Sequence, residues 1–267
     1  MSLLVRGEGP ASVRVTPQSA GWAYVGFEAL TLAPGAAASR RLDGVEVCVV
    51  PLRGDPIVRA DGGEWQLGGR AHPLDGPARC LYVPAGLQLE LEAREEACEV
   101  AICSAPDGAA ALPPHPIEPD SLVVVPRGEG ASLRHVRDIA MAPGTAQSLL
   151  VTEVHTPAGH WSSFPPHKHD RDEPATETLL EETYYHRLRP SPGFGLQRVY
   201  DAEGTLEETV AFGDGDVVLV PRGYHTVSAP PGYDLYYLNV MAGPHREWVV
   251  RDDPAHAWLR PRSGGGS

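Results

Sequence analysis

The chain has 267 residues, a formal net charge of −13 at pH 7 and 42% hydrophobic residues, which suffices for one large β domain or two smaller ones. The acidic balance argues against a nucleic-acid partner, because few cations remain to neutralise phosphates. No apolar run approaches the roughly 20 residues of a membrane span, and the first residues, MSLLVRGEGP, lack the apolar core of a signal peptide. We therefore expect a cytoplasmic protein without a membrane partner.

In chain order, the sequence consists of short β-type runs separated by turn residues. Its 27 prolines and 29 glycines occur at short intervals, and many runs between them alternate apolar and polar residues as half-buried strands do. No window shows a sustained helical period. The runs are VEVCVV (45–50), CLYVPAG (80–86), LQLELEA (87–93), CEVAIC (98–103), SLLVTEV (148–154), ETYYHRL (182–188), GLQRVY (195–200), DVVLVP (216–221) and LYYLNVM (235–241). We predict an all-β fold of sandwich or barrel units.

Two segments of the chain resemble each other. Residues 74–93 (LDGPARCLYVPAGLQLELEA) and 212–230 (FGDGDVVLVPRGYHTVSAP) both contain a β-type run, a Pro-x-Gly turn and a second β-type run. Aligning the two turns places Gln88 opposite His225. Such self-similarity predicts two copies of one β-barrel unit, although Pro-x-Gly is also a common turn.

The stretch between the two copies predicts a domain boundary. Residues 111–120 (ALPPHPIEPD) are rich in proline, as linkers often are. We therefore predict an N-terminal domain over residues 1–118 and a C-terminal domain over residues 119–262, with 263–267 (SGGGS) as a tail or tag remnant. The N-terminal domain has no His-x-His, and we expect it to be structural and to lack metal ligands.

The C-terminal domain concentrates residue types that bind metals. His167 and His169 alternate within PPHKHD, so on a strand both side chains project to one face. His225 follows a Pro-x-Gly turn, and Glu181 and Glu182 begin another β-type run, where alternation lets only one of them face the histidines. Three imidazoles and one carboxylate suit Zn²⁺, Mn²⁺, Fe²⁺ or Ni²⁺.

The spacing of these residues resembles the two motifs of the cupin superfamily. The pattern reads Gly159-x7-His167-x-His169, then a glutamate, then Gly215-x5-Pro221-x-Gly223-x-His225. In the common first motif the glutamate follows the second histidine closely, whereas here the nearby Asp172 and Glu173 fall in a polar loop. We interpret this loop as an insertion and assign the ligand to Glu182, with Glu181 as the alternative.

Longer segments of the second half narrow the resemblance. TPAGHWSSFPPHKHD, LEETYYHRLRPSPGFGLQRVY and VPRGYHTVSAPPGYDLYYLNVMAGP closely resemble the 5-deoxy-glucuronate isomerase family of bacterial myo-inositol catabolism, which is related to the 4-deoxy-5-keto-uronate isomerases. The first half resembles this family only in architecture. The resemblance implies a bicupin, two β-barrel (jelly-roll) cupin domains in tandem, with His167, His169, Glu182 and His225 as metal ligands. It also implies a divalent cofactor, Zn or Mn before Fe or Ni, and a deoxy-uronate substrate.

The implied reaction is an aldose–ketose isomerisation, in which a proton moves from C2 to C1 through an enediolate. A divalent metal would polarise the carbonyl and stabilise the negative charge. Glu182, Glu181 and Tyr184 are the candidates for moving the proton. Arg198 is the candidate for the substrate carboxylate, because a guanidinium binds a carboxylate at two points; its alternative is a cross-strand ion pair. Tyr237 is a further candidate for the substrate site.

Three other features have less specific interpretations. Lys168, the only lysine of the chain, lies between two inward-facing positions, so we expect it to face away as a solvated or interface residue. His186 lies at an even offset from Glu182 and is a minor candidate for the metal-facing side. Residues 127–139 (RGEGASLRHVRDI) resemble a phosphate-binding glycine turn only weakly, and we expect a loop and the start of a strand near an interface.

Two other functions fit the same motifs. One is a cupin dioxygenase that uses Fe(II) or Ni(II), and the other is a non-enzymatic sugar-binding cupin, a class whose members commonly lose their ligands. The complete ligand set of the second half favours an enzyme. The expected partner is a small molecule, and a homo-oligomer is possible.

Overall fold

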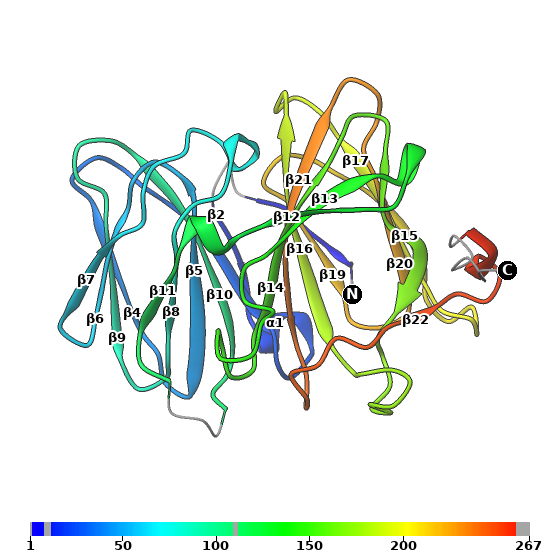
Figure 1. Ribbon diagram of the computed structural model, residues 1–267, viewed down its shortest axis with the longest axis horizontal. Helices are drawn as coiled ribbons and strands as arrows, with labels where there is room; N and C mark the ends of the chain where they lie inside the picture. Colours follow the sequence, from blue (N-terminus) through cyan, green and yellow to red (C-terminus); the bar gives the residue numbers. More distant parts are fainter. Residues whose placement is uncertain (1, 8–11, 109–111, 260–267) are drawn as a thin grey trace, which may run out of the picture.

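The protein consists of two β-barrels that lie side by side (Figure 1). The computed structural model describes residues 2–7, 12–108 and 112–259, so the expected tail at 263–267 lies outside the described residues. The all-β prediction is confirmed, since all nine β-type runs named above contain a strand. Among the described residues, no helix is long and apolar enough to cross a membrane.

The first barrel is built from ten strands and one short helix. Its elements are β2 (Ser12–Val15), α1 (Pro17–Ala20), β3 (Gly26–Leu32), β4 (Ala37–Arg41), β5 (Val45–Arg53), β6 (Ile57–Ala60), β7 (Gly63–Gln66), the 3₁₀ turn η1 (Pro73–Asp75), β8 (Cys80–Val83), β9 (Gln88–Glu92), β10 (Cys98–Pro106) and β11 (His115–Ile117). The 3₁₀ turn η2 (Pro119–Ser121) leads into the second barrel.

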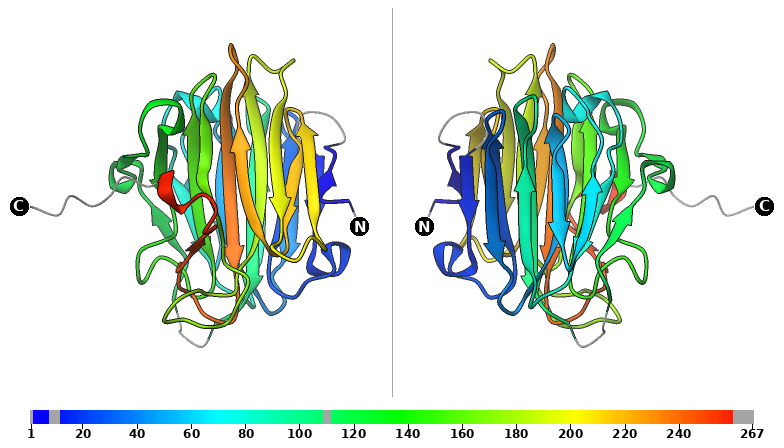
Figure 2. Two further views of the ribbon diagram at one scale, coloured as in Figure 1. Left: turned by 90° about the vertical axis from the view of Figure 1, so that its right-hand side faces the viewer. Right: turned by 90° about the vertical axis from the view of Figure 1, so that its left-hand side faces the viewer.

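The second barrel follows in the chain, and its strands run nearly parallel to those of the first (Figure 2). Its elements are β12 (Val124–Arg127), η3 (Gly130–Ser132), β13 (Arg134–Asp138), β14 (Leu150–Thr156), β15 (Trp161–Lys168), β16 (Glu181–Arg189), β17 (Gly195–Tyr200), β18 (Glu207–Phe212), β19 (Val217–Val220), β20 (Tyr224–Ser228), β21 (Asp234–Ala242), β22 (Arg251–Asp252) and η4 (Ala257–Leu259).

The sheet topology repeats between the barrels. The strand order β11-β8-β5-β10-β3-β2 in the first barrel corresponds to β1-β19-β16-β21-β14-β13 in the second, where β1 is Leu4–Val5 and β12 adds one more strand at the edge. In the smaller sheets, β4-β9-β6-β7 corresponds to β15-β20-β17-β18, and β22 adds a strand beside β15. The two Pro-x-Gly turns also match, because Gly86 and Gly223 have φ values of 86° and 85°, which glycine adopts without strain. The repeat expected from the sequence is therefore present in the topology.

The first strand of the chain does not belong to the first barrel. β1 (Leu4–Val5) pairs with β19 of the second barrel, and the backbone N–H of Gly7 donates to Asp216. In the first barrel, the matching edge of β8 is covered instead by β11. The expected assignment of residues 1–118 to one domain is therefore wrong for this strand, which two residues of sequence could not reveal by periodicity.

The interior of the first barrel is apolar. Apolar side chains from both of its sheets form one buried cluster, which includes Leu42, Val58, Leu81 and Leu89. Gln88, which aligns with His225 in the sequence repeat, is exposed. The described part of the first barrel is thus filled by hydrophobic packing, as a structural domain requires.

The barrels share a core where their larger sheets meet. Phe27 of β3 packs on Tyr185 of β16, with ring centroids 5.1 Å apart, inside a buried cluster drawn from both barrels. Polar groups also cross this boundary: the Arg187 Nη1 group donates to Glu99 at 2.9 Å, and both side chains are buried. The sheet that carries half of the functional site is therefore anchored on the other barrel.

Candidate metal centre

Three buried histidines meet inside the second barrel. His167 on β15 and His225 on β20 are direct cross-strand partners, and His169 follows immediately after β15. One ring nitrogen from each of the three lies within 4.8 Å of the others. The His167 and His225 ring centroids are 4.7 Å apart, which brings the i and i+2 pair and the distant third histidine to one point.

The carboxylate of the cluster comes from the facing sheet. The Glu182 Oε2 atom lies 3.1 Å from His169 Nε2 and 3.2 Å from His225 Nε2. Glu181 points the opposite way, because neighbouring strand residues alternate: its carboxylate accepts the backbone N–H groups of Ala23, Tyr24 and Val25 in the first barrel. Glu181 is therefore excluded, by its position, as the alternative ligand and as a proton carrier.

The inserted loop after His169 closes on itself and returns the chain to the cluster. His169 and Leu180 exchange contacts, since Leu180 N–H donates to the His169 carbonyl and the His169 Nδ1 lies 2.9 Å from the Leu180 carbonyl. Residues 170–179 form the loop between them, with Asp172 and Glu173 exposed. The insertion therefore changes the sequence spacing of Glu182 while leaving it beside His169 in space.

The electrostatics of the cluster favour a neutral His167 beside an ionised Glu182. Burial, together with the neighbouring His225 and His169 rings, holds the pKa of His167 well below its ordinary value. Burial also opposes the ionisation of Glu182, but the neighbouring His169 and His225 imidazoles outweigh it and lower the pKa of Glu182 to about 2. For His169, burial lowers the pKa, but the bond with Glu182 outweighs this effect and the net pKa is raised.

The donor set fits a divalent metal ion. His225 Nε2 is buried and, although close to Glu182, makes no hydrogen bond of ordinary geometry. A buried ring nitrogen without such a bond is costly unless another partner occupies its lone pair. Three imidazoles and one carboxylate match the preferences of Zn²⁺, Mn²⁺, Fe²⁺ and Ni²⁺, so His167, His169, Glu182 and His225 would hold the ion.

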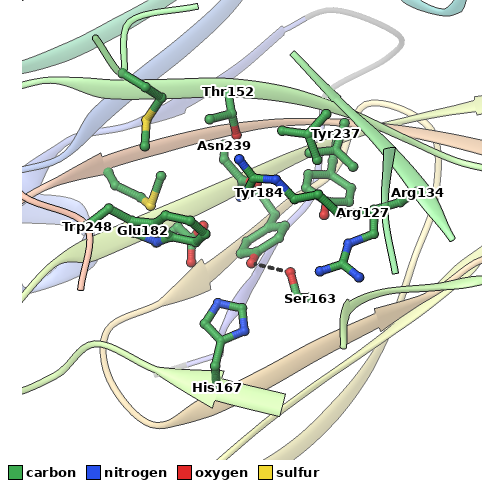
Figure 3. Close-up of a pocket in the computed structure, with 14 residues that line it drawn as sticks. Arg127, Arg134, Thr152, Ser163, His167, Glu182, Tyr184, Tyr237, Asn239 and Trp248 are labelled. Carbon is green, nitrogen blue, oxygen red and sulfur yellow. Dashed lines mark hydrogen bonds between the residues drawn. The ribbon is translucent and has the colours of Figure 1, made fainter. Parts of the chain in front are cut away.

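A cavity opens beside this cluster (Figure 3). Tyr184 faces it, and its hydroxyl lies 2.9 Å from Ser163 Oγ. Burial and the nearby Glu182 carboxylate raise the pKa of Tyr184 well above its ordinary value, so the phenol is protonated. The lining residues are Arg127, Arg134, Val136, Met141, Thr152, Val154, Ser163, His167, Glu182, Tyr184, Tyr237, Asn239, Met241 and Trp248.

Of the other residues singled out in the sequence, Tyr237 reaches the cavity and Arg198 does not. Tyr237 packs on Tyr184 with ring centroids 5.0 Å apart. Arg198 lies on β17 with a side chain 42% exposed and forms a two-point ion pair with Glu207 on β18. The expected role of Arg198 in carboxylate binding is not supported, and its alternative, a cross-strand ion pair, is what the structure contains.

Lys168 and His186 both lie outside the three-histidine cluster and outside the lining of the cavity. Lys168 does not line the cavity, as alternation predicted, but it is buried rather than solvated, with its ammonium group bonded to Asp170 and Glu177. The expectation of a solvated or interface lysine was therefore wrong. His186 stacks on Phe212 and lies 3.0 Å from Gln197 Oε1, away from the three-histidine cluster.

Sequence reasoning missed the two arginines of the cavity. Arg127 and Arg134 belong to the stretch 127–139, which was expected to be a loop and the start of a strand. It contains that loop and strand start, and it connects two paired strands, β12 and β13, which bring Arg127 directly opposite Arg134. No local pattern in the sequence marks this pairing, because the strands are short and half-exposed.

A family model described as the KduI/IolB family matches residues 3–259 of the chain. The chain belongs to the KduI/IolB family. It is 48% identical over 249 residues to a 5-deoxy-glucuronate isomerase of Geobacillus kaustophilus, covering 92% of this chain and 90% of that protein. It is 40% identical over 251 residues to the 5-deoxy-glucuronate isomerase of Bacillus subtilis, covering 93% and 92%. The family expected from the sequence is thus confirmed.

Solved structures support the same fold. An IolB-like protein from Salmonella typhimurium superposes with a TM-score of 0.93 at 42% identity, covering 97% of this chain and 99% of that chain. Oxalate decarboxylase from Lactobacillus farciminis superposes with a TM-score of 0.66 at 15% identity, covering 93% and 85%. At this low identity the second likeness concerns the fold alone, and it supports the bicupin expected from the motifs.

Proposed function

We propose that this member of the KduI/IolB family is a metal-dependent aldose–ketose isomerase that converts 5-deoxy-glucuronate to 2-deoxy-5-keto-gluconate in myo-inositol catabolism. The observation that carries the proposal is the convergence of three buried histidines and Glu182 at the wall of a cavity lined by phenol and hydroxyl groups. The relatives that bear the name 5-deoxy-glucuronate isomerase span nearly the whole chain, which supports the choice of substrate. The cytoplasm is the expected location.

The ligand set defines what the cofactor would contribute. When bound by His167, His169, Glu182 and His225, a divalent ion, Zn²⁺ or Mn²⁺ in the first instance, supplies a Lewis acid that polarises the substrate carbonyl. The low pKa of Glu182 keeps it ionised at neutral pH, which suits a ligand. The neutral His167 likewise presents a lone pair instead of a positive charge.

The residues of the cavity provide the remaining chemistry. Tyr184 is protonated and buried, so its hydroxyl can donate to the substrate oxygen that gains negative charge as the C2 proton leaves. Ser163, bonded to that hydroxyl at 2.9 Å, fixes its direction. Of the two carboxylates considered as proton carriers, only Glu182 reaches the cavity.

The test combines metal analysis with turnover of 5-deoxy-glucuronate, followed by NMR detection of the ketose. We expect metal-loaded protein to isomerise the substrate with or without oxygen, and His167→Ala and His225→Ala variants to lose both metal and activity. Tyr184→Phe should keep the metal and lose most of the turnover. Full activity in metal-stripped protein, or turnover that stops under anaerobic conditions, would contradict the proposal.

A further inference from the structure

The proposed substrate carries a carboxylate, so the site requires a cation that is directed at the cavity. Two arginines meet this requirement: Arg127 at the end of β12 and Arg134 at the start of β13 both line it. Glu182 is the one carboxylate among the described residues of this lining, and it already faces the histidines. The cavity is therefore cationic at its arginine side.

The two arginines lie side by side at the end of one hairpin. Arg127 and Arg134 are direct cross-strand partners, so their side chains leave the strands on the same face. Arg127 also contacts Asp138 at 3.5 Å, and its side chain is 32% exposed. A guanidinium group presents N–H donors in a fork that matches a carboxylate, which is the group the proposed substrate would bring to this end of the cavity.

The surrounding contacts direct both groups toward the metal centre. The Arg127 guanidinium lies over the Trp248 ring, 5.3 Å from its centroid, and the same Trp248 makes an edge contact with His167 at 6.3 Å. Arg134 Nη1 donates to the carbonyl of Phe164, three residues before His167 on β15. In Figure 3 the Arg127 and Arg134 side chains enter the same cavity as the Tyr184 hydroxyl, and His167 lies below them.

Two other cations on this barrel lie outside the lining of the cavity. Lys168 is held by Asp170 and Glu177, and Arg198 is paired with Glu207 outside the cavity. Neither contributes to the lining.

We propose that Arg127 and Arg134 together bind the substrate carboxylate and determine the preference of the enzyme for a sugar acid over the neutral sugar. This inference rests on the proposed function for the identity of the acid. It also assigns an orientation: the carboxylate end lies at the β12–β13 hairpin, and the aldehyde end lies at the histidine cluster.

The experiment compares 5-deoxy-glucuronate with 5-deoxy-glucose, which carries a hydroxymethyl group in place of the carboxylate. Binding is measured by calorimetry and turnover by NMR, on metal-loaded wild-type, Arg127→Gln and Arg134→Lys proteins. Hydrogen bonds to charged groups contribute about 1.5–3 kcal/mol, so we expect Arg127→Gln to weaken binding of the acid roughly 10- to 100-fold. Binding of the neutral sugar should change little. Arg134→Lys keeps the positive charge but loses the two-point hydrogen bonding of the guanidinium group, so we expect a smaller loss of affinity for the acid.

Arg198→Gln is the matched control, because it removes an exposed arginine on the same barrel and should leave the preference for the acid unchanged. Metal content and melting temperature of each variant show whether β15 has moved. If wild-type protein prefers the acid but does not isomerise it, the proposed function fails and the carboxylate site stands. If it isomerises the acid and the Arg127 and Arg134 variants keep the wild-type preference, the carboxylate site is refuted and the function stands.

Discussion

The Lys168→Met substitution removes the charge that holds the inserted loop next to the metal ligands. The ammonium group bonds to Asp170 and, at 2.9 Å, to Glu177 Oε1, while the Glu177 side chain is fully buried. Glu177 Oε2 has no hydrogen-bond partner among the described residues, and Glu177 Oε1 accepts from the Lys168 ammonium and from the backbone N–H of Asp170. Of these two donors, the lysine brings the positive charge. Burial lowers the pKa of Lys168, but the bonds with Asp170 and Glu177 outweigh it, and the ammonium stays charged.

The expected loss follows from breaking a buried ion pair on one side. Such a change costs about 3–5 kcal/mol, because the remaining charge keeps its desolvation cost without its partner. Methionine conserves most of the apolar stem, so the loss reports on the charge rather than on packing. For a chain of this size, the loss corresponds to a fall in melting temperature of roughly 10 °C.

The assay is urea unfolding, followed by tryptophan fluorescence and by circular dichroism so that the two transitions can be compared. The double variant Lys168→Met/Glu177→Gln is the matched test, since it removes the uncompensated carboxylate and should recover part of the stability. A single variant within about 1 kcal/mol of wild type, or a double variant less stable than the single one, would refute the reasoning.

Three further predictions concern the interface, the pH dependence and the metal. Glu181→Ala leaves three backbone N–H groups of the first barrel without their acceptor, so we expect at least about 3 kcal/mol of lost stability in urea unfolding; a stability equal to wild type would contradict this role. Burial and the nearby Arg189 lower the pKa of His72 to about 4. The stability that neutral His72 contributes to the fold is therefore complete above about pH 6.5 and is lost as the pH falls toward 4. His72→Asn keeps a cap acceptor for Leu74 N–H and should show a shallower fall in urea midpoint over this range; an equal slope would contradict this. Chelation should lower the melting temperature of wild type by several degrees and leave His225→Ala unaffected.

Alternation along strands made much of the site predictable from the sequence. It placed His167 and His169 on one face and required Glu181 and Glu182 to point apart, and both are seen. What it could not supply is the identity of cross-strand neighbours. Arg127 and Arg134 meet because two short strands pair, which depends on the turn between them and on packing against distant parts of the chain. Such contacts leave no period in the sequence.

The solvation of Lys168 was misjudged for a related reason. Alternation along a strand predicts the direction of each Cβ atom, and it correctly predicted that the Lys168 side chain points away from the cavity. Alternation does not show whether acidic residues lie near the ammonium group at the end of the side chain. Here the inserted loop folds back and places Glu177 there, and Asp170 also accepts the backbone N–H of Gly223 in the turn before His225. The single lysine thus joins the loop to two segments that carry ligands.

The first barrel, which has no metal ligands among its described residues, helps to shape the site through its contacts with β16, a strand of the second barrel that packs on the first. Along this strand Glu182 and Tyr184 face the metal centre and the cavity, while their neighbours Glu181, Tyr185 and Arg187 face the first barrel. Because alternation is fixed by the backbone, a shift of β16 by one residue would exchange these two sets. The contacts of the outward set with the first barrel therefore specify the register that aims Glu182 at the histidines. In this way the first barrel, which has no metal ligands of its own, is required to position the ligand Glu182 in the second barrel.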